Sequence, residues 1–391
     1  MAVMNVTTYG FQIVAARLLG PPEYGALAGL MALLLVLSVL QLGLQATAAR
    51  RIAAEPDHVA QIERTILAVT YRAALALGAL TLLAFPAVWL LLRLNDPVPA
   101  VLLAAATVPM TVMGGQAGIL QGERRWGSLA AVYVAVGVPR VLIGSVCILV
   151  SPTVTSAMLG VLLALLVPVL VGHLALRGGR PEGVDSDDHR HRAVIREAVI
   201  SSIALLGFFV VSSVDIVIAR NLLDSHDAGL YAGGLILTKA VLFLPQFVVV
   251  IVFPSMSTER ARRPALLGGL ALVIGLGVVS TLGTWLFSDL AVTFVGGSEY
   301  AEVKPSLWLF AILGMLLAVL QLLVYSVLAR RGTRTTYIVW LGAVALVVAA
   351  LSADSVTALV VTVLVVDAAL VVVLLGISLW RLRRPSTAAP Q

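Results

Sequence analysis

Charged residues are scarce in this chain, and their scarcity excludes a soluble globular domain. Only 12% of the 391 residues are Asp, Glu, Lys or Arg, whereas 60% are hydrophobic; soluble domains carry about a quarter charged residues. The single cysteine, Cys147, excludes a disulfide framework and a thiolate metal cluster. Basic residues outnumber acidic ones, 26 to 20, but they are scattered over short segments and form no nucleic-acid-binding patch. The composition therefore indicates an integral membrane protein surrounded by membrane lipids.

The chain contains instead a series of apolar runs, each close to the roughly 20 residues that a helix needs to cross a bilayer. The first run is the weakest, because it includes Asn5, Thr8 and Gln12, yet it lacks the basic start and the continuous apolar middle of a signal peptide. We therefore predict an all-α integral membrane protein with about twelve transmembrane helices. The predicted spans are residues 3–19, 24–49, 65–93, 97–121, 128–150, 154–176, 194–219, 229–256, 264–288, 304–329, 335–352 and 355–380.

The basic residues predict the orientation of these spans. With a cytoplasmic amino terminus, twenty of the 26 Lys and Arg residues fall in or next to inner segments and four fall on the outside, namely Arg17, Arg93, Arg220 and Lys304. Positive charge accumulates on the cytoplasmic side of membrane proteins. We expect a multi-pass protein of the inner or plasma membrane, with both termini in the cytoplasm.

A short hydrophilic break occurs twice. "ARLLGPPEYGALAG" at 16–29 returns as "ARNLLDSHDAGLYAG" at 219–233, with Asn221 inserted. The same offset maps six spans onto six spans in the same sense, which predicts two lobes related by a pseudo-two-fold axis along the membrane normal. The paired residues are Ala16 and Arg17 with Ala219 and Arg220, Leu18 and Leu19 with Leu222 and Leu223, Glu23 with Asp227, Gly25 with Gly229, and Ala28 and Gly29 with Ala232 and Gly233.

The repeat divides the chain into an N-lobe at 1–177, a C-lobe at 194–384 and a cytoplasmic tail at 385–391. Between the lobes, residues 178–193 form a hydrophilic linker rich in Gly, Pro and charge. Its acids and histidines could ligate a metal, but a solvated linker explains them, because nothing fixes their geometry. We predict no metal site.

Enzymatic machinery is absent from the sequence. The spans consume nearly the whole chain, and no nucleotide-binding glycine loop, HExxH, GxSxG or acidic pair at metal spacing occurs. We expect no catalytic residues, no cofactor and no enzyme. Two lobes of six helices with short loops are typical of a secondary transporter.

Several segments resemble one transporter family. These are the hairpin at 16–29, Asp215 followed by Gly229-Leu230-Tyr231, "FPSMS" at 253–257 and "FVGGSEYAEV" at 294–303. They are similar to the polysaccharide-transporter and oligosaccharide-flippase branch of the MOP (multidrug/oligosaccharidyl-lipid/polysaccharide) superfamily. The resemblance implies alternating-access movement of lipid-linked sugars from the inner to the outer leaflet, often coupled to an ion gradient.

Ionisable groups inside spans are the best candidates for function, because each costs about 2.5–3.5 kcal/mol to insert. Lys239 lies ten residues beyond Gly229, about 15 Å along a helix and near the midplane; Arg140 lies at similar depth in the fifth span. We expect both to line a shared cavity and to bind the diphosphate of a polyprenyl-linked sugar. The alternative is that Lys239 pairs with Asp367 or Asp215.

Two further sets of polar residues are candidates. Asp215 and Asp367 are candidate sites for H⁺ or Na⁺ coupling, although an ion pair of Asp215 with Arg220 explains the first equally. Gln12 and Gln41 belong to polar stripes that face either the cavity or a neighbouring helix. Gly269, Gly275 and Gly283 are expected to be close-packing sites.

The leading functional hypothesis is a flippase for a lipid-linked oligosaccharide used in cell-surface polysaccharide biosynthesis, with polysaccharide assembly enzymes as open partners. A multidrug exporter of the related branch is the first alternative. It would be expected to carry buried acids and aromatics, whereas aromatics make up 6% of the chain. A non-transporting scaffold of an assembly complex is the second alternative, and it would need no charges in mid-membrane.

Overall fold

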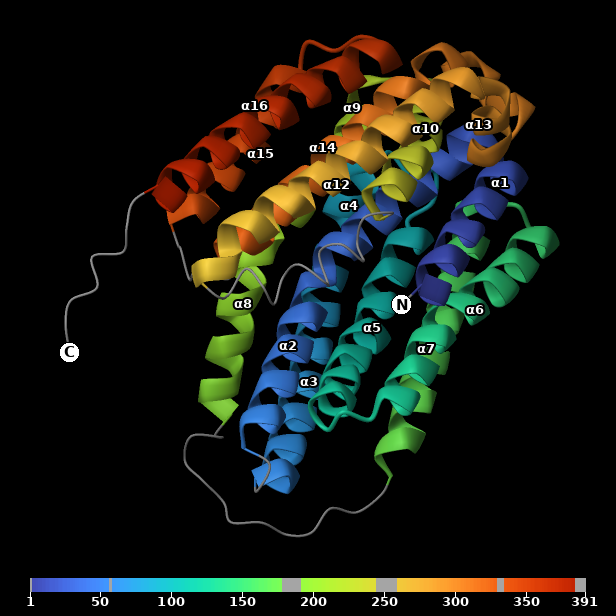
Figure 1. Ribbon diagram of the computed structural model, residues 1–391. Coiled ribbons are helices and arrows are strands. Elements are labelled where there is room, and N and C mark those ends of the chain that lie inside the picture. The colour runs from blue at the N-terminus through green and yellow to red at the C-terminus, as the bar shows by residue number, and fades with distance from the viewer. Residues whose placement is uncertain (1, 56–57, 178–190, 244–258, 329–333, 384–391) are drawn as a thin grey trace.

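The computed structural model describes residues 2–55, 58–177, 191–243, 259–328 and 334–383. Within these ranges the regular structure is entirely helical (Figure 1). Nine helical segments there are long and apolar enough to cross a membrane. One of them, Val3–Ala54, contains the first two predicted spans, and α15 is a shorter apolar helix. The predicted fold class is confirmed. Residues 178–190 of the predicted linker, residues 244–256 of the eighth predicted span, the segment at 253–257 and the tail at 385–391 lie outside the described residues.

The helices follow the predicted spans closely. The first six spans are covered by α1 (Ala2–Leu37), α2 (Val39–Ala54), α3 (Val59–Leu83), α4 (Phe85–Leu91), α5 (Val98–Gly122), α6 (Trp126–Val150) and α7 (Val154–Leu176). The remaining spans are covered by α8 (His191–Val211), α9 (Val214–Leu222), α10 (Ser225–Phe243), α12 (Glu259–Leu286), α13 (Ser288–Val295), the 3₁₀ segment η3 (Ser298–Ser306), α14 (Leu307–Leu328), α15 (Arg334–Ala350) and α16 (Val356–Arg383).

The first predicted hairpin turns at a single residue. Gly20 has φ 70° and ψ 170° inside the otherwise helical α1, a conformation that costs glycine little and other residues much. Pro21 and Pro22 follow directly, and their fixed φ suits the first turn of the returning helix. The sequence Gly-Pro-Pro therefore ends one span and begins the next.

Equivalent glycines of the two repeats meet. A methyl carbon added to Gly25 would lie 3.0 Å from the Cα and N of Gly229, and one added to Gly229 would overlap the carbonyl of Pro21. Self-contact between matched positions is what a two-fold axis passing between the repeats requires. We call the end of the molecule that carries residues 16–25 and 219–229 the hairpin end. Few of the Lys and Arg residues fall at this end, so the distribution of positive charge predicts that it is the extracytoplasmic end.

One helix of the second half, α8, packs against helices of the first half. α8 packs against α2 and α3, where Val194 and Ala198 join a buried apolar cluster with Leu44 and Ile62. Gly43 permits this approach, because a side chain there would meet Ala198 and Ser202. Both Arg50 and Arg51 of α2 form ion pairs with Glu197 of α8. This contact ties the halves together on one side.

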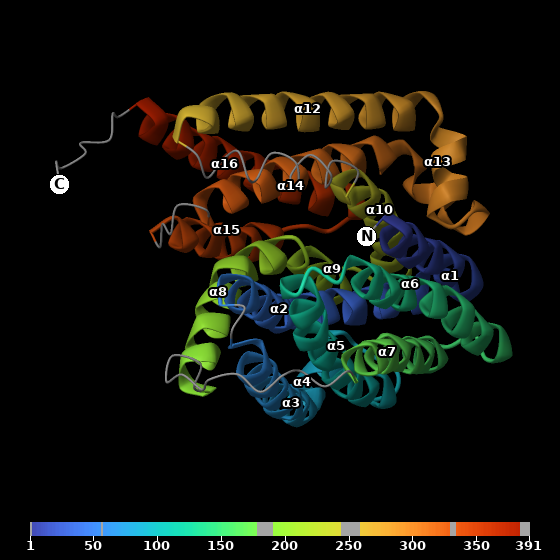
Figure 2. The same ribbon diagram turned by 60° about the horizontal axis from the view of Figure 1, so that its bottom comes forward.

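Away from the hairpin end the two halves separate, except at α8 of the second half, which packs against α2 and α3. Helices α12, α14, α15 and α16 run one way and α2, α3, α5 and α7 another, with α8 beside the second set (Figures 1 and 2). None of the first set packs extensively against α2–α7 in the described part of the chain, whereas α1 packs against α10. The molecule is therefore closed at the hairpin end and splayed at the opposite, arginine-rich end.

The expectation that Gly275 and Gly283 are close-packing sites is wrong. A side chain at either position of α12 would meet no atom of the described residues within 4 Å, so neither glycine makes a close helix contact within the part of the chain that the structure describes. The close contact on α12 is made by Gly277, which packs against Met315 of α14.

Candidate functional site

A group of buried polar residues lies where α1, α9, α10 and α16 meet. Asp215 of α9 is 2% exposed and Asp367 of α16 is fully buried. Lys239 of α10 interacts electrostatically with both carboxylates. We call the half-buried Lys239 together with the buried Asp215 and Asp367 the buried charge cluster. Three of the predicted site residues are therefore brought together, although they come from three helices.

Hydrogen bonds fix two members of this cluster. Lys239 Nζ donates to the backbone carbonyl of Ser212 at 2.5 Å, at the break between α8 and α9 where that carbonyl lacks a helical partner. The Tyr231 hydroxyl donates to Asp215 Oδ2 at 3.0 Å, and the Ile216 N–H donates to Oδ1 at 2.9 Å. The alternative ion pair of Asp215 with Arg220 is not formed.

Asp367 differs from Asp215 in having no hydrogen bond. Both of its carboxylate oxygens are buried without a hydrogen-bond partner among the described residues. Buried carboxylates are costly unless they are paired or protonated. One lysine and two aspartates leave one unit of negative charge uncompensated. A single monovalent cation, a proton included, neutralises the cluster.

Arg140 lies elsewhere. It follows Gly137 by three residues and precedes Gly144 by four, so it shares the face of α6 on which these glycines contact Thr7 and Phe11 of α1. Its Nε is buried without a hydrogen-bond partner in the described ranges. Tyr9, on another face of α1, donates to the carbonyl of Lys239 at 3.1 Å. In this conformation α1 therefore separates Arg140 from Lys239. Lys239 interacts electrostatically with both acids, whereas its Nζ contacts the Ser212 carbonyl, so the pairing of Lys239 with an acid stays a prediction.

The predicted glutamines lie in the first half. Gln12 of α1 and Gln41 of α2 are both half-buried, and Gln41 packs against Gly114 of α5. A neighbour, Gln45, donates from Nε2 to the Tyr133 hydroxyl at 2.8 Å and to Gln121 Oε1 at 3.0 Å. Gln45 of α2 is therefore hydrogen-bonded to α5 and α6 in this conformation.

Two residues of the charge cluster's surroundings were not singled out from the sequence. Tyr231 was noted only as part of the "GLY" motif, and Tyr9 was not considered. Their signal was available, because a tyrosine hydroxyl buried in a span needs a polar partner.

The matched arginines of the repeat each bind the opposite half. Arg17 of the first half donates to the Thr293 carbonyl of α13 at 2.5 Å. Arg220 of the second half donates to the Leu92 and Arg93 carbonyls that follow α4, each at 3.1 Å. We call these bonds the reciprocal arginine clasp. They join the two halves across the hairpin end.

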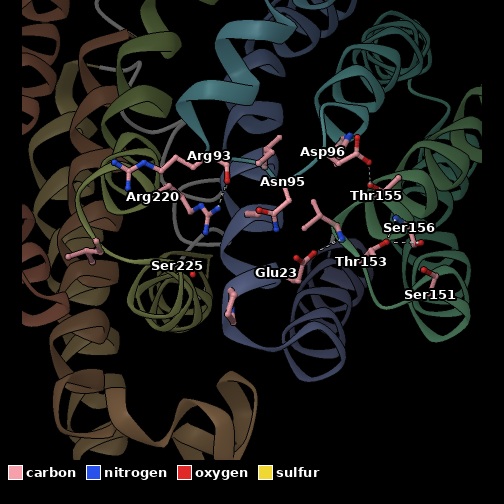
Figure 3. Close-up of a pocket in the computed structure, with 16 residues that line it drawn as sticks. Glu23, Arg93, Asn95, Asp96, Ser151, Thr153, Thr155, Ser156, Arg220 and Ser225 are labelled. Carbon is pink, nitrogen blue, oxygen red and sulfur yellow. Dashed lines mark hydrogen bonds between the residues drawn. The ribbon is translucent and has the colours of Figure 1, made fainter.

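Beside the clasp lies a cavity of about 550 Å³ (Figure 3). It is open to the hairpin-end surface, and neither Lys239 nor Arg140 lines it. A second cavity, of about 130 Å³, lies among α3, α5 and α7 and includes Glu63, Gln116 and His173. The described residues contain no group of three or more His, Cys, Asp or Glu suited to a metal ion.

Similar folds occur among transporters. The chain superimposes on an inward-facing multidrug resistance MATE family transporter of the MOP superfamily with a TM-score of 0.79, at 13% identity, covering 98% of this chain and 94% of that one. For the eukaryotic MATE transporter AtDTX14 the TM-score is 0.69, at 12% identity with 97% and 92% covered. For an outward-facing MATE family transporter it is 0.65, at 13% identity with 97% and 95% covered.

Sequence comparison identifies the family. No curated protein matches the chain. The model of the family described as "Polysaccharide biosynthesis protein" matches residues 1–259, more than half of the chain. Both the family and the structural neighbours consist of transporters rather than enzymes. The chain thus belongs to the polysaccharide biosynthesis protein family, a membrane transporter family of the MOP superfamily.

Proposed function

We propose that this protein is a flippase that moves a polyprenyl-diphosphate-linked oligosaccharide from the inner to the outer leaflet for cell-surface polysaccharide biosynthesis. The family match supports the substrate class. The mechanism is alternating access, in which two halves open in turn toward opposite sides of the membrane around a fixed central region. The protein lies in the inner or plasma membrane, with both termini in the cytoplasm.

The observation that carries this proposal is the buried charge cluster beneath a closed hairpin end. Lys239, Asp215 and Asp367 lie on three helices of the second half, and Tyr9 of the first half bonds to the backbone of Lys239. Because Tyr9 of α1 is bonded to Lys239 of α10, we expect a change in the charge of the cluster to weaken or strengthen the contact between α1 and α10. Binding of a proton or Na⁺ at Asp367 is the proposed coupling step.

Arg140 is the proposed ligand of the diphosphate. Its guanidinium has a buried Nε without a partner in the described residues, and a guanidinium binds phosphate oxygens in a bidentate manner. Gln12 and Gln41, from α1 and α2, supply amides on the same half. Lys239, which is engaged with Ser212 and the two acids, is assigned to coupling instead.

The conformation corresponds to the loading state. The reciprocal arginine clasp closes the predicted outer end, and the halves diverge toward the predicted cytoplasmic end. The higher TM-score to the inward-facing than to the outward-facing MATE transporter agrees with this assignment. A lipid-linked sugar would enter from the cytoplasmic leaflet.

A multidrug exporter is the second candidate function, favoured by the fold neighbours and by the buried acids. Organic cations would then bind Asp215 or Asp367 directly, and Arg140 would repel them. A scaffold without transport would tolerate a neutral replacement of Arg140, and neutral replacements of Lys239, Asp215 or Asp367 would change only its stability.

The proposal is tested in cells that lack the gene for this protein. We expect lipid-linked oligosaccharide to accumulate in the cytoplasmic leaflet and surface polysaccharide to be lost, with rescue by the wild type. Arg140→Gln should not rescue, whereas Arg140→Lys, which keeps the charge but loses the bidentate geometry, should rescue weakly. Equal rescue by Arg140→Gln, at matched protein levels in the membrane, would show that the substrate anion does not bind there.

A further inference from the structure

The cavity beside the reciprocal arginine clasp is built from both halves of the molecule. The first half contributes the start of the returning helix at Glu23, the loop after α4 and the loop before α7; the second half contributes Arg220, Leu223 and Ser225. Its volume of about 550 Å³ lies within the roughly 300–1,000 Å³ of small-molecule sites. It is distinct from the central charge cluster, which contributes no residue to its wall.

Hydrogen bonds hold the polar wall in place. Glu23 Oε2 accepts from the Val154 N–H at 3.0 Å, and Asp96 accepts from the Val98 N–H and the Thr155 hydroxyl at 3.0 and 3.2 Å. Two of these bonds, those from Val98 and Val154, use the first N–H groups of α5 and α7, which have no helical partner. A carboxylate has about four acceptor sites, so both acids keep capacity for a ligand.

The side chains converge on one space. In Figure 3 the carboxylate of Glu23, the amide of Asn95 and the guanidinium of Arg220 point toward the same part of the cavity. Arg220 is only 6% exposed and is held by two carbonyls. Donors and acceptors thus alternate along a rigid wall, an arrangement suited to a ligand that offers many hydroxyl groups.

The charges of the wall balance. Arg93 and Arg220 are opposed by Glu23 and Asp96, so an anion or a cation would each meet groups of its own sign. Among the described residues that line the cavity there is no aromatic ring, which disfavours flat organic cations. Leu94, Pro99 and Leu223 supply apolar surface for C–H faces. This combination fits an uncharged, polyhydroxylated ligand.

We propose that this cavity is a second site, which binds a neutral oligosaccharide from the extracytoplasmic side and holds the hairpin end closed. The sugar identity rests on the proposed function, because the delivered product carries a glycan on that side. A ligand that contacts both Asn95 and Ser225 binds only while the halves touch. Its occupancy therefore favours the closed hairpin end and slows further export as product accumulates.

The test measures binding directly on the purified full-length protein. Saturation-transfer NMR is recorded with lipid-free maltotriose, cellotriose and chitotriose, and with the anionic trisaccharide sialyllactose. Ser225 is exposed and lines the cavity, so the variant Ser225→Trp fills the cavity with an indole ring. The matched control is Ser352→Trp, because Ser352 is an exposed serine in the loop before α16 and does not line the cavity. Asn95→Leu removes the amide with little risk to folding, because Asn95 is exposed.

We expect at least one neutral trisaccharide to bind with millimolar affinity. Ser225→Trp should weaken it by about tenfold or more, Asn95→Leu should also weaken it, and Ser352→Trp should have no effect. The bound sugar should raise the thermal unfolding midpoint of the wild type but not of Ser225→Trp. No binding by any neutral trisaccharide, equal binding by Ser225→Trp, or tighter binding of sialyllactose would each overturn the site. If the site were overturned in this way, flipping of a lipid-linked oligosaccharide by the wild type would still support the proposed function. Conversely, binding of a neutral trisaccharide without any flipping would contradict the proposed function and leave the site intact.

Discussion

At the residue scale, the central feature is a charge imbalance in a region from which water is largely excluded. Lys239 faces two acids; Asp215 is hydrogen-bonded by Tyr231, but Asp367 has no hydrogen-bond partner in the described part of the chain. Removing one member of a buried charge set leaves the others uncompensated, which is more costly than removing the set. Single and double substitutions should therefore behave differently.

Lys239→Gln should destabilise the protein by about 3 kcal/mol, because two acids then face each other without a cation. The double variant Lys239→Gln with Asp215→Asn should recover most of the stability but not transport. Thermal unfolding in detergent and export in the same strain measure the two effects. Recovery of both properties in the double variant would mean that Lys239 serves structure alone.

Asp367→Asn should uncouple transport from the ion gradient, because the amide cannot take up a proton and binds Na⁺ more weakly. We expect the rate of flipping in reconstituted vesicles to become independent of an imposed pH or Na⁺ gradient. Asp354→Asn, an exposed position in the loop before α16, is the control and should respond as the wild type does. An unchanged gradient dependence in Asp367→Asn would remove Asp367 from the coupling step.

The sequence identified these charges and offered the pairing of Lys239 with Asp367 or Asp215 only as an alternative. A lysine and two aspartates inside apolar spans are visible as exceptions, whereas the contact between them depends on how α9, α10 and α16 pack. Lys239 and Arg140 were expected to share a cavity because their depths match. Depth alone does not reveal that α1 lies between them.

At the element scale, the crossing of α1 and α10 decides how closely the halves approach. Glycine at positions 25 and 229 allows the two backbones to touch. The repeat paired these glycines from the sequence, whereas the turn at Gly20 was found only in the structure. The breaks at Ser38 and at Ser212–Ser213 were not predicted, since neither contains Gly or Pro.

Gly229→Ala should lower stability by about 2 kcal/mol, because the added methyl group would overlap the Pro21 carbonyl, a backbone atom that cannot rotate away. Gly275→Ala on α12 is the matched control. Its methyl group would point into open space, and alanine is favoured over glycine in a helix by about 1 kcal/mol. Equal thermal unfolding midpoints for the two variants would contradict the close crossing.

At the scale of the whole molecule, the repeat produces the same bond twice. Arg17 and Arg220 occupy matched positions, and each donates to carbonyl groups at or just after a short helix of the other half, α13 or α4. The sequence aligned the two arginines and placed them on the outer side of the membrane. Their partners could not be predicted, because Thr293 and Leu92 contribute backbone oxygens that any residue would supply.

Arg17→Ala combined with Arg220→Ala should shift the equilibrium toward opening at the hairpin end, since the bonds broken exist only in the closed form. Spin labels on either side of the hairpin end should report a larger population of long distances. Lys304→Ala, which removes an exposed ion pair with Asp289 within one half, is the control and should leave the distances unchanged. A distance distribution identical to that of the wild type would show that the clasp does not hold the halves together.

The most direct test of the whole account is flipping by the purified protein in vesicles. A fluorescent polyprenyl-diphosphate oligosaccharide is placed in both leaflets, and its protection from an external quencher is followed. We predict translocation well above that of empty vesicles, accelerated by an ion gradient and lost in Arg140→Gln. Translocation no faster than in empty vesicles, with organic cations moved instead, would contradict a lipid-linked sugar as the substrate.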